Sequence, residues 1–232
     1  VKITPMPQGY YLAVVNQSSL GQCSGITHLL SLAAAEGKQH IFLGNIYQVL
    51  AHPDAPESQV FFQKIAQVQN LLDEARVAHD PATVKLAPYT SIAPELINSP
   101  VTKTLLMSSQ GHRISAGVIV GPDRERSYYY DDPNAALAEF SSTQAFEKGL
   151  KRIFTSPELK GFNDPIDGGT ADPKYLISVF NPEHVPEVSG SHNHVRFMYD
   201  APLSGLDTVK VIDASRVPTA QALVARAPAS TG

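Results

Sequence analysis

The sequence of 232 residues contains a single cysteine, Cys23, and no tryptophan. One cysteine cannot form a disulfide within the chain, and no spacing of cysteine and histidine resembles a structural zinc site. We therefore expect neither a metal nor any other cofactor. A lone thiol survives as a thiol only in reducing surroundings, and we expect the protein to work there.

The chain is also poor in charge and lacks long hydrophobic runs. Charged residues make up 17% of it, the net charge is −4, and both signs are interspersed. The absence of a basic stripe argues against a nucleic-acid partner, and the absence of a lysine-rich amphipathic helix argues against a membrane surface. No apolar run approaches the roughly 20 residues that span a bilayer. The remaining composition, with 43% hydrophobic residues, is that of a globular domain.

The hydrophobic pattern predicts helices early in the chain and strands late in it. A helix is expected to begin at Cys23, because apolar residues follow at helical spacing and Gly37 stands where a C-capping glycine belongs. A second helix is predicted over residues 56–78, which carry one apolar stripe. Strands are predicted over residues 10–16, 175–180, 194–200 and 208–213.

This order of elements indicates the α+β class, with helices packed on one face of an antiparallel sheet. We expect residues 1–213 to form one domain, within which residues 154–213 are an accessory region. Residues 214–232, rich in Ala, Pro and Ser, are expected to form a linker-like tail. Because the chain begins at Val1 and not at Met, we expect it to be a piece of a longer polypeptide.

Cys23 is a candidate nucleophile because of its place at the expected start of a helix. The free N–H groups and the dipole of a helix N-terminus favour the thiolate, which is the reactive form of cysteine. The neighbouring Ser24 and Gly25 are small, so that a substrate could approach closely. The alternative is a buried structural cysteine, which is a common environment for this residue.

A base and an acid are predicted from the hairpin that starts at His112. Alternating apolar residues after His112 predict a strand, Gly121-Pro122-Asp123 a turn, and RSYYYDD a second strand. If the turn has three residues, position 112 lies opposite 132, so that Asp132 stands beside His112 and Asp131 points to the other face. A carboxylate beside an imidazole orients it in a catalytic triad. A bulge would exchange the two aspartates, and a solvated surface ribbon remains the alternative.

Acyl chemistry also needs donors for an oxyanion. The backbone N–H of Cys23 is the first candidate. For a second donor, a side-chain amide just upstream, we favour Gln17 over Asn16 and Gln22, because a short turn can fold it back over the helix N-terminus.

Taken together, these motifs resemble the papain-like cysteine proteases of the YopT type. The matching stretches are GQCSG followed by an apolar helix, and His112 opening a strand with Asp132-Pro133-Asn134 after the next one. AEFSSTQAFEKGL beyond them also suits that family, so that the resemblance covers about residues 10–153. It implies a papain-like fold, with Cys23 as nucleophile, His112 as base and Asp132 as the residue that orients it. The chain departs from the family in having no tryptophan in the helix after the cysteine.

A second triad has the same order along the chain. His194, in SHNHV with His192, opens a predicted strand, and Asp213 ends the next one. Its acid cannot be assigned by a hairpin count, so it ranks below the triad with His112. A metal site built on His192 and His194 has no third ligand at a matching spacing.

The resemblance implies a thiol hydrolase from a bacterial toxin or effector. Such domains are secreted by the bacterium and act on a host protein in the host cytoplasm, and we expect the same here, after release from, or within, a larger toxin or effector chain. The triad also supports glutamine deamidation or acyl transfer. A non-catalytic binding module, in which Cys23 is only part of the core, is the rival hypothesis.

Overall fold

A seven-stranded antiparallel sheet forms the centre of the computed structural model. The structure describes residues 1–6, 23–75, 82–109, 112–156, 173–182 and 193–204. The strand order is β1-β6-β5-β4-β3-β7-β2. The strands are β1 Lys2–Pro5, β2 Lys85–Pro88, β3 Lys103–Ser109, β4 His112–Val120, β5 Arg126–Asp132, β6 Ala136–Phe140 and β7 Lys174–Val179. Strands β3 to β6 follow one another as a meander, and β7 inserts between β3 and β2.

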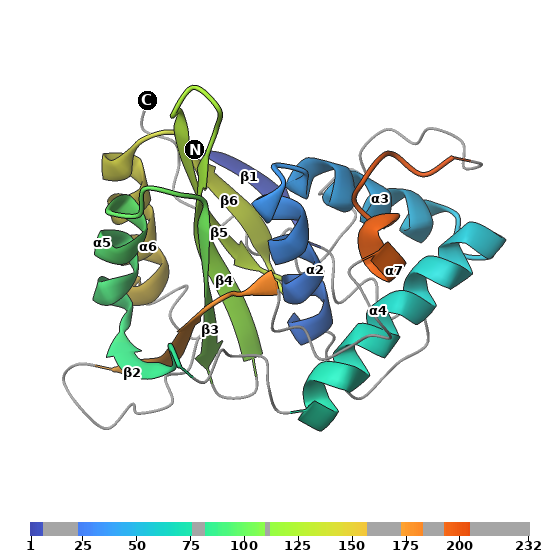
Figure 1. Cartoon of the computed structure of the whole chain (residues 1–232), viewed down its shortest axis with the longest axis horizontal. Coiled ribbons are helices and arrows are strands. Elements are labelled where there is room, and N and C mark those ends of the chain that lie inside the picture. The colour runs from blue at the N-terminus through green and yellow to red at the C-terminus, as the bar shows by residue number, and fades with distance from the viewer. Residues whose placement is uncertain (7–22, 76–81, 110–111, 157–172, 183–192, 205–232) are drawn as a thin grey trace.

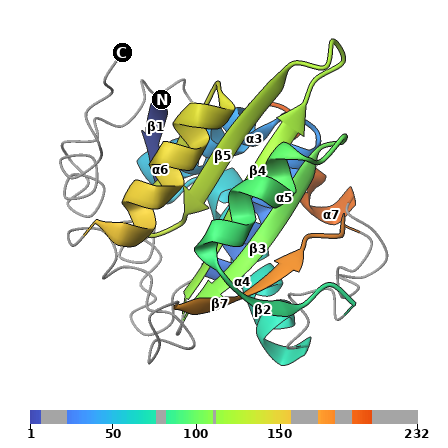
Figure 2. The same ribbon diagram turned by 90° about the vertical axis from the view of Figure 1, so that its left-hand side faces the viewer.

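Helices cover both faces of the sheet, which corrects the expectation that they pack on one face only. On one side lie α2, α3 and α4, and on the other α5 and α6 (Figure 1, Figure 2). Their bounds are α2 Cys23–Ala35, α3 Gln39–Ala51, α4 Pro56–Ala75, the 3-10 turn η1 Tyr89–Ser91, α5 Ile92–Ile97, α6 Thr143–Thr155 and α7 Asn193–Arg196. None of the described helices is long and apolar enough to cross a membrane. The α+β class is confirmed.

Two hydrophobic cores lie on opposite sides of the sheet. One joins α2, α3 and α4 to Tyr129 and Leu137 of the sheet. The other joins α5 and α6 to a sheet face that is almost wholly apolar, made of alternate residues of β3, β4 and β5. The alternation of side chains along each strand produces this division, because successive residues point to opposite faces.

Both predicted helices are present. The first begins at Cys23, and Gly37 after its end has φ of +70°, the left-handed conformation that a C-capping glycine adopts. The second, α4, begins at Pro56 and is described to Ala75. The helix α3 between them was not predicted. The strand predicted over residues 175–180 is confirmed as β7, whereas those over 10–16 and 208–213 and the tail over 214–232 lie outside the described residues.

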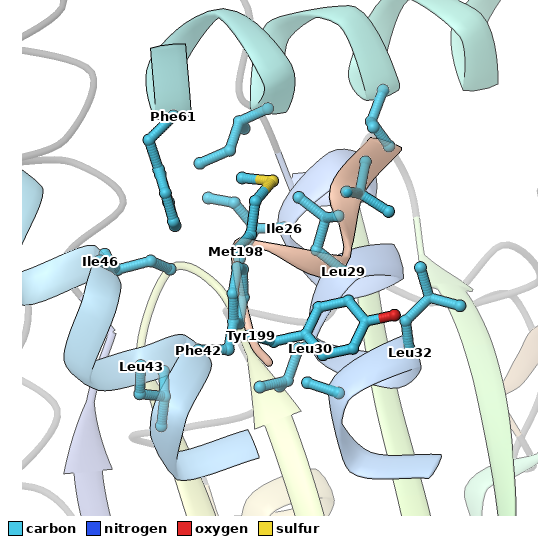
Figure 3. Packing of buried hydrophobic residues seen from close by; sticks show 14 of the residues in the cluster. Ile26, Leu29, Leu30, Leu32, Phe42, Leu43, Ile46, Phe61, Met198 and Tyr199 are labelled. Carbon is cyan, nitrogen blue, oxygen red and sulfur yellow. The ribbon is translucent and has the colours of Figure 1, made fainter. Parts of the chain in front are cut away.

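The predicted strand over residues 194–200 is wrong, because this segment forms the short helix α7 and a turn. Val195, Met198 and Tyr199 are buried, a spacing of three and then one residue that matches a helical turn and not an extended strand. Figure 3 shows Met198 and Tyr199 between side chains of α2, α3 and α4. Part of the region beyond residue 154 therefore belongs to the main helical core, and β7 belongs to the main sheet.

Asn45 of α3 fastens this segment to the helical layer. Asn45 is only 1% exposed. Its side-chain nitrogen donates to the carbonyl groups of Met198, at 2.9 Å, and Ala201, at 3.1 Å. It also accepts from the N–H of Leu203 at 3.0 Å. One buried amide thus satisfies three backbone groups outside any regular element.

Replacing Asn45 with Ala is expected to lower the free energy of unfolding by about 3 kcal/mol, because partly buried backbone groups lose their partner. Urea unfolding followed by circular dichroism measures it. Asn70→Ala on the exposed side of α4 is the matched control and should leave the free energy unchanged or slightly raised, since alanine favours helix. Equal stabilities of the two variants would contradict the role of Asn45.

Candidate active site

The first turn of α2 is held against α4. The backbone N–H of Gly25 donates to Oε1 of Gln69 at 2.8 Å, which satisfies one donor that the helix itself leaves unpaired. A Cβ atom at Gly25 would lie 3.0 Å from the carbonyl oxygen of Ile65 and 3.2 Å from the backbone nitrogen of Gln69. Gly25 therefore permits a close approach of two helices. This differs from the expectation that it leaves room for a substrate.

Gly25→Ala is consequently expected to destabilise the protein by about 2 kcal/mol, because backbone atoms of α4 must move to admit the methyl group. Thermal unfolding measures this loss. Gly44→Ala in α3 is the matched control, since no atom lies within 4 Å of its added Cβ. The control should be neutral or up to about 1 kcal/mol more stable, given the helix propensities of the two residues. A Gly25→Ala protein as stable as this control would refute the helix contact.

His112 and Asp132 form a close pair. Nε2 of His112 lies 2.6 Å from Oδ1 of Asp132, and the side chains are only 10% and 4% exposed. His112 is the first residue of β4, opposite Ser109 of β3, and Asp132 is the last residue of β5. The pair lies at the end of the sheet where β3 turns into β4. A hydrogen bond removed from water in this way is electrostatically stronger than one at the surface.

The pair forms even though the predicted hairpin register is wrong by two residues. Val120 pairs with Arg126, so the loop has five residues, Gly121 to Glu125, in place of three. Within it Arg124 takes the left-handed φ of 59°. A shift of two residues keeps every side chain on its face. Asp132 therefore stays on the side of His112 and contacts it diagonally, while Asp131 pairs with Ser115.

Asn134 is a member of the site that sequence reasoning missed. Its backbone N–H donates to Oδ1 of Asp132 at 2.9 Å, and its side-chain nitrogen lies 3.3 Å from Nδ1 of His112. The N–H of Ala135 closes the turn by donating to the carbonyl of Asp132 at 2.8 Å. The signal in the sequence was the spacing of two residues from Asp132 to Asn134, since an aspartate side chain commonly accepts a hydrogen bond from the backbone N–H two residues later. In the sequence, Asn134 was noted only as part of the Asp132-Pro133-Asn134 motif that resembles the family.

Asp131 has surroundings unlike those of Asp132. It is fully buried, at 0% exposure, and neither carboxyl oxygen has a hydrogen-bond partner in the described part of the chain. Burial raises the pKa of the Asp131 carboxyl well above its usual range, and the adjacent Asp132 raises this pKa further, whereas His112 lowers it. Adjacent aspartates thus differ sharply in environment.

The start of α2 lies beside the start of β4. Oγ1 of Thr27 lies 3.4 Å from the carbonyl oxygen of Arg113, to which it donates. Thr27 is one helical turn after Cys23, and Arg113 directly follows His112. The backbone of Cys23 is therefore about one turn, roughly 5–6 Å, beyond a residue that contacts the His112 segment. The position of the Cys23 sulfur lies outside what the structure describes.

The remaining candidates fall partly outside the described residues. Gln17, the expected oxyanion donor, lies there, and so do His192 and Asp213. His194 does not open a strand as predicted: it is an exposed residue of the short helix α7. Among the described residues, no group of three His, Cys, Asp or Glu side chains could hold a metal ion.

Comparison with known families bears on this arrangement. The family model described as the Mcf1 protease effector domain matches residues 1–189. The chain belongs to this family. The match includes Cys23, His112 and Asp132 and both sides of the sheet up to β7. No curated protein matches the chain.

A solved structure shares the fold of this protease effector domain. It is PatoxP, a cysteine protease-like domain of the Photorhabdus asymbiotica toxin PaTox, with a TM-score of 0.55 and 11% sequence identity. The match covers 79% of this chain and 56% of PatoxP, so the chain spans little more than half the length of that structure. The expected protease effector domain is thereby confirmed by the family, and its fold is shared with a cysteine protease-like domain. Neither comparison tests membership of the YopT type in particular.

Proposed function

We propose that this protease effector domain cleaves a host protein through a Cys-His-Asp triad made of Cys23, His112 and Asp132. The observation that carries the proposal is the buried pair of His112 and Asp132, 2.6 Å apart, next to the first turn of the helix that begins at Cys23. A thiol at a helix N-terminus, a histidine and an orienting carboxylate are the groups that a cysteine protease needs.

The contact between Nε2 of His112 and Asp132 determines which imidazole nitrogen can act as the base. If Nε2–H donates to Asp132, Nδ1 is the basic nitrogen. Nδ1 then takes the proton of the Cys23 thiol as the sulfur attacks the carbonyl carbon of a peptide bond. The imidazolium, stabilised by Asp132, returns this proton to the leaving amine as the C–N bond breaks. Water, deprotonated by Nδ1, cleaves the thioester, and the thiol recovers its proton.

The oxyanion of the tetrahedral intermediate needs two donors. The N–H of Gly25 is already bound to Gln69 and is a poor candidate. We therefore keep the N–H of Cys23 and the side-chain amide of Gln17 as the donors. Loss of a single oxyanion donor elsewhere costs roughly 100- to 1,000-fold in rate.

Because His112 is the first residue of β4, the thiol and the imidazole would meet at the end of the sheet. His112 and Asp132 belong to the alternate set of strand residues that faces α5 and α6, whereas α2 lies on the other side. At the end of β4 the N-terminal half of α2 comes near them, because Thr27 lies against the Arg113 carbonyl. A substrate would bind along this end.

We further propose that the domain works in the host cytoplasm after delivery by a secreted bacterial toxin, of which it forms one part. Membership of a family of protease effector domains supports this setting. A reducing cytosol would also keep the single thiol active. Amide hydrolysis by a thiol, an imidazole and a carboxylate proceeds without a cofactor.

The test is mass spectrometry of eukaryotic lysates treated with the wild-type domain or with Cys23→Ala. New protein N-termini that appear only with the wild type would support proteolysis. Conversion of glutamine to glutamate, or acylated lysines, without new N-termini would replace proteolysis by deamidation or acyl transfer on the same triad. Identical lysates would move the function to binding.

A further inference from the structure

A polar seam lies between α2 and the sheet, where a hydrophobic contact is usual. One stripe of α2 at helical spacing is polar and buried: Ser24, Thr27, His28 and Ser31. Thr27 contacts β4, and the ring of His28 packs edge-on against Phe180 after β7 at 5.3 Å, so this stripe faces the sheet. The facing sheet residues include Thr104, Ser115, Asp131 and Ser178, all buried. The opposite face of the same strands is apolar.

Among the described residues of the seam, Asp131 is the only buried carboxyl. It lies on the α2 side because Tyr129, two residues earlier, packs into the core of α2, α3 and α4. Ser115 stands directly opposite it on β4. Neither carboxyl oxygen of Asp131 nor the Ser115 hydroxyl bonds to another described protein group. Such groups are costly to bury, so their presence beneath the nucleophile helix calls for a role.

We propose that Asp131 is a positioning residue, which through the polar seam holds the first turn of α2 in register with the start of β4 and so sets Cys23 against His112. The inference rests on the proposed function. The described hydrogen bond between this part of α2 and β4 is that of Thr27 with the Arg113 carbonyl, and Arg113 lies two residues before Ser115, the partner of Asp131 across the strands. A hydrogen bond depends on direction and distance far more than an apolar contact does, so this part of the seam limits how far α2 slides along the sheet. A shift of about 1 Å between catalytic groups can cost roughly 100-fold in rate.

Asp131 can fill this role only as a neutral acid. The ionisable groups that act on it are Asp132 on its own strand and His112 on β4, and Asp131 in turn acts on Tyr129. Arg113 is two residues before Ser115 on β4, and His28 is the ionisable residue of the α2 stripe. No ion pair joins Asp131 to any described cation, and the neighbouring Asp132 carboxylate opposes a second negative charge. A neutral carboxyl can donate its O–H as well as accept, whereas an anion would put two like charges side by side.

The neutral acid makes stability depend on pH with a definite sign. The pKa of Asp131 is raised in the folded state. Its favourable contribution is therefore complete below the unfolded pKa of about 3.9 and is lost as pH rises toward the folded value. Asp131→Asn keeps the shape and cannot ionise, so its melting temperature should exceed that of the wild type by an increasing margin from pH 5 to pH 9. If Asp131→Asn does not melt at a higher temperature than the wild type at pH 9, Asp131 is not a neutral acid in the folded protein.

Alkylation of Cys23 tests the positioning directly, because it is the only thiol in the chain. We would measure the second-order rate constant with iodoacetamide from pH 5 to pH 10 for wild type, Asp131→Asn, Asp131→Ala and Ser115→Ala. At pH 7 we expect Asp131→Ala to react about tenfold more slowly, as the thiol pKa moves toward the roughly 8.5 of free cysteine. Asp131→Asn should restore most of the rate, and Ser115→Ala should fall between them. Asp123→Asn, in the exposed β4–β5 loop, controls for the loss of a carboxyl elsewhere.

The outcomes separate the two proposals. Fast alkylation of the wild type with unchanged rates in Asp131→Ala and Ser115→Ala would overturn the positioning role and leave the triad intact. A loss in Asp131→Asn as large as in Asp131→Ala would also overturn it, because the neutral isostere would then have failed to rescue. A wild-type thiol that reacts only on unfolding would reject the proposed function and the inference with it. If Asp131→Ala does not fold, Asp131→Asn and Ser115→Ala still decide.

Discussion

Cys23→Ala is expected to reduce the rate of proteolysis by at least about 10⁴-fold, since a triad without its nucleophile keeps only what binding and the oxyanion site supply. Cys23→Ser should be almost as inactive, because a serine hydroxyl ionises far less readily than a thiol next to the same histidine. The measurement is the rate at which new protein N-termini form in a eukaryotic lysate at equal enzyme concentration. Circular dichroism must show that both variants are folded.

The same substitution should remove the effect of the domain on living cells. Expression of the wild type in a eukaryotic cytosol should produce a phenotype that Cys23→Ala does not. Mild peroxide should silence the purified wild type, and dithiothreitol should restore it, because a sulfenic acid or mixed disulfide is reversible. If wild type and Cys23→Ala have equal effects in cells, catalysis is not the function.

His112→Ala is expected to cost about 10³- to 10⁴-fold, because the thiol loses its base and the leaving amine its acid. Asp132→Asn should be comparably severe, since an amide accepts less strongly from Nε2 and does not stabilise the imidazolium. The double variant His112→Ala with Asp132→Asn should be little worse than either single variant, as members of one triad act as a unit. Rates at pH 7 and the thermal unfolding of each variant provide the comparison.

His194→Ala is the matched control for this experiment. His194 is exposed on α7, and its loss should leave the rate within about twofold of wild type, as for most surface substitutions. An inactive His194→Ala beside a fully active His112→Ala would reinstate the competing triad. An inactive Asp131→Ala with an active Asp132→Ala would transfer the acid role to the neighbouring aspartate.

The pairing of His112 with Asp132 could be predicted because it needs only that the two side chains lie on the same face of the sheet, and not that the strand register is exact. The loop proved to have five residues, yet an even shift leaves each side chain on its face, and the reach of an imidazole covers the diagonal. The start of α2 at Cys23 was readable for a similar reason, since apolar spacing and the Gly37 cap are local signals.

The sequence could not show which face each helix covers. The apolar stripe of α6 fits either side of a sheet, and only the apolar alternate residues of β3 to β5 select one. The segment after residue 193 looked extended because Val195, Phe197 and Tyr199 alternate, but the side chains that are buried follow a helical spacing. Its conformation is decided by Asn45, which is about 150 residues away in the chain and binds Met198 and Ala201.

By itself the sequence determined the local features of this protein: a lone thiol at a helix start, a hairpin with histidine and aspartate on one face, and the α+β class. These depend on residue type and short-range periodicity, which the chain carries within each segment. Only the tertiary structure decided that Gly25 lies against α4, that the Asn134 side chain lies beside the ring of His112, and that Asp131 is buried in a polar seam beneath α2. Each of these is a contact between segments far apart in the chain or a difference in burial between neighbours, and neither is set until the layers pack.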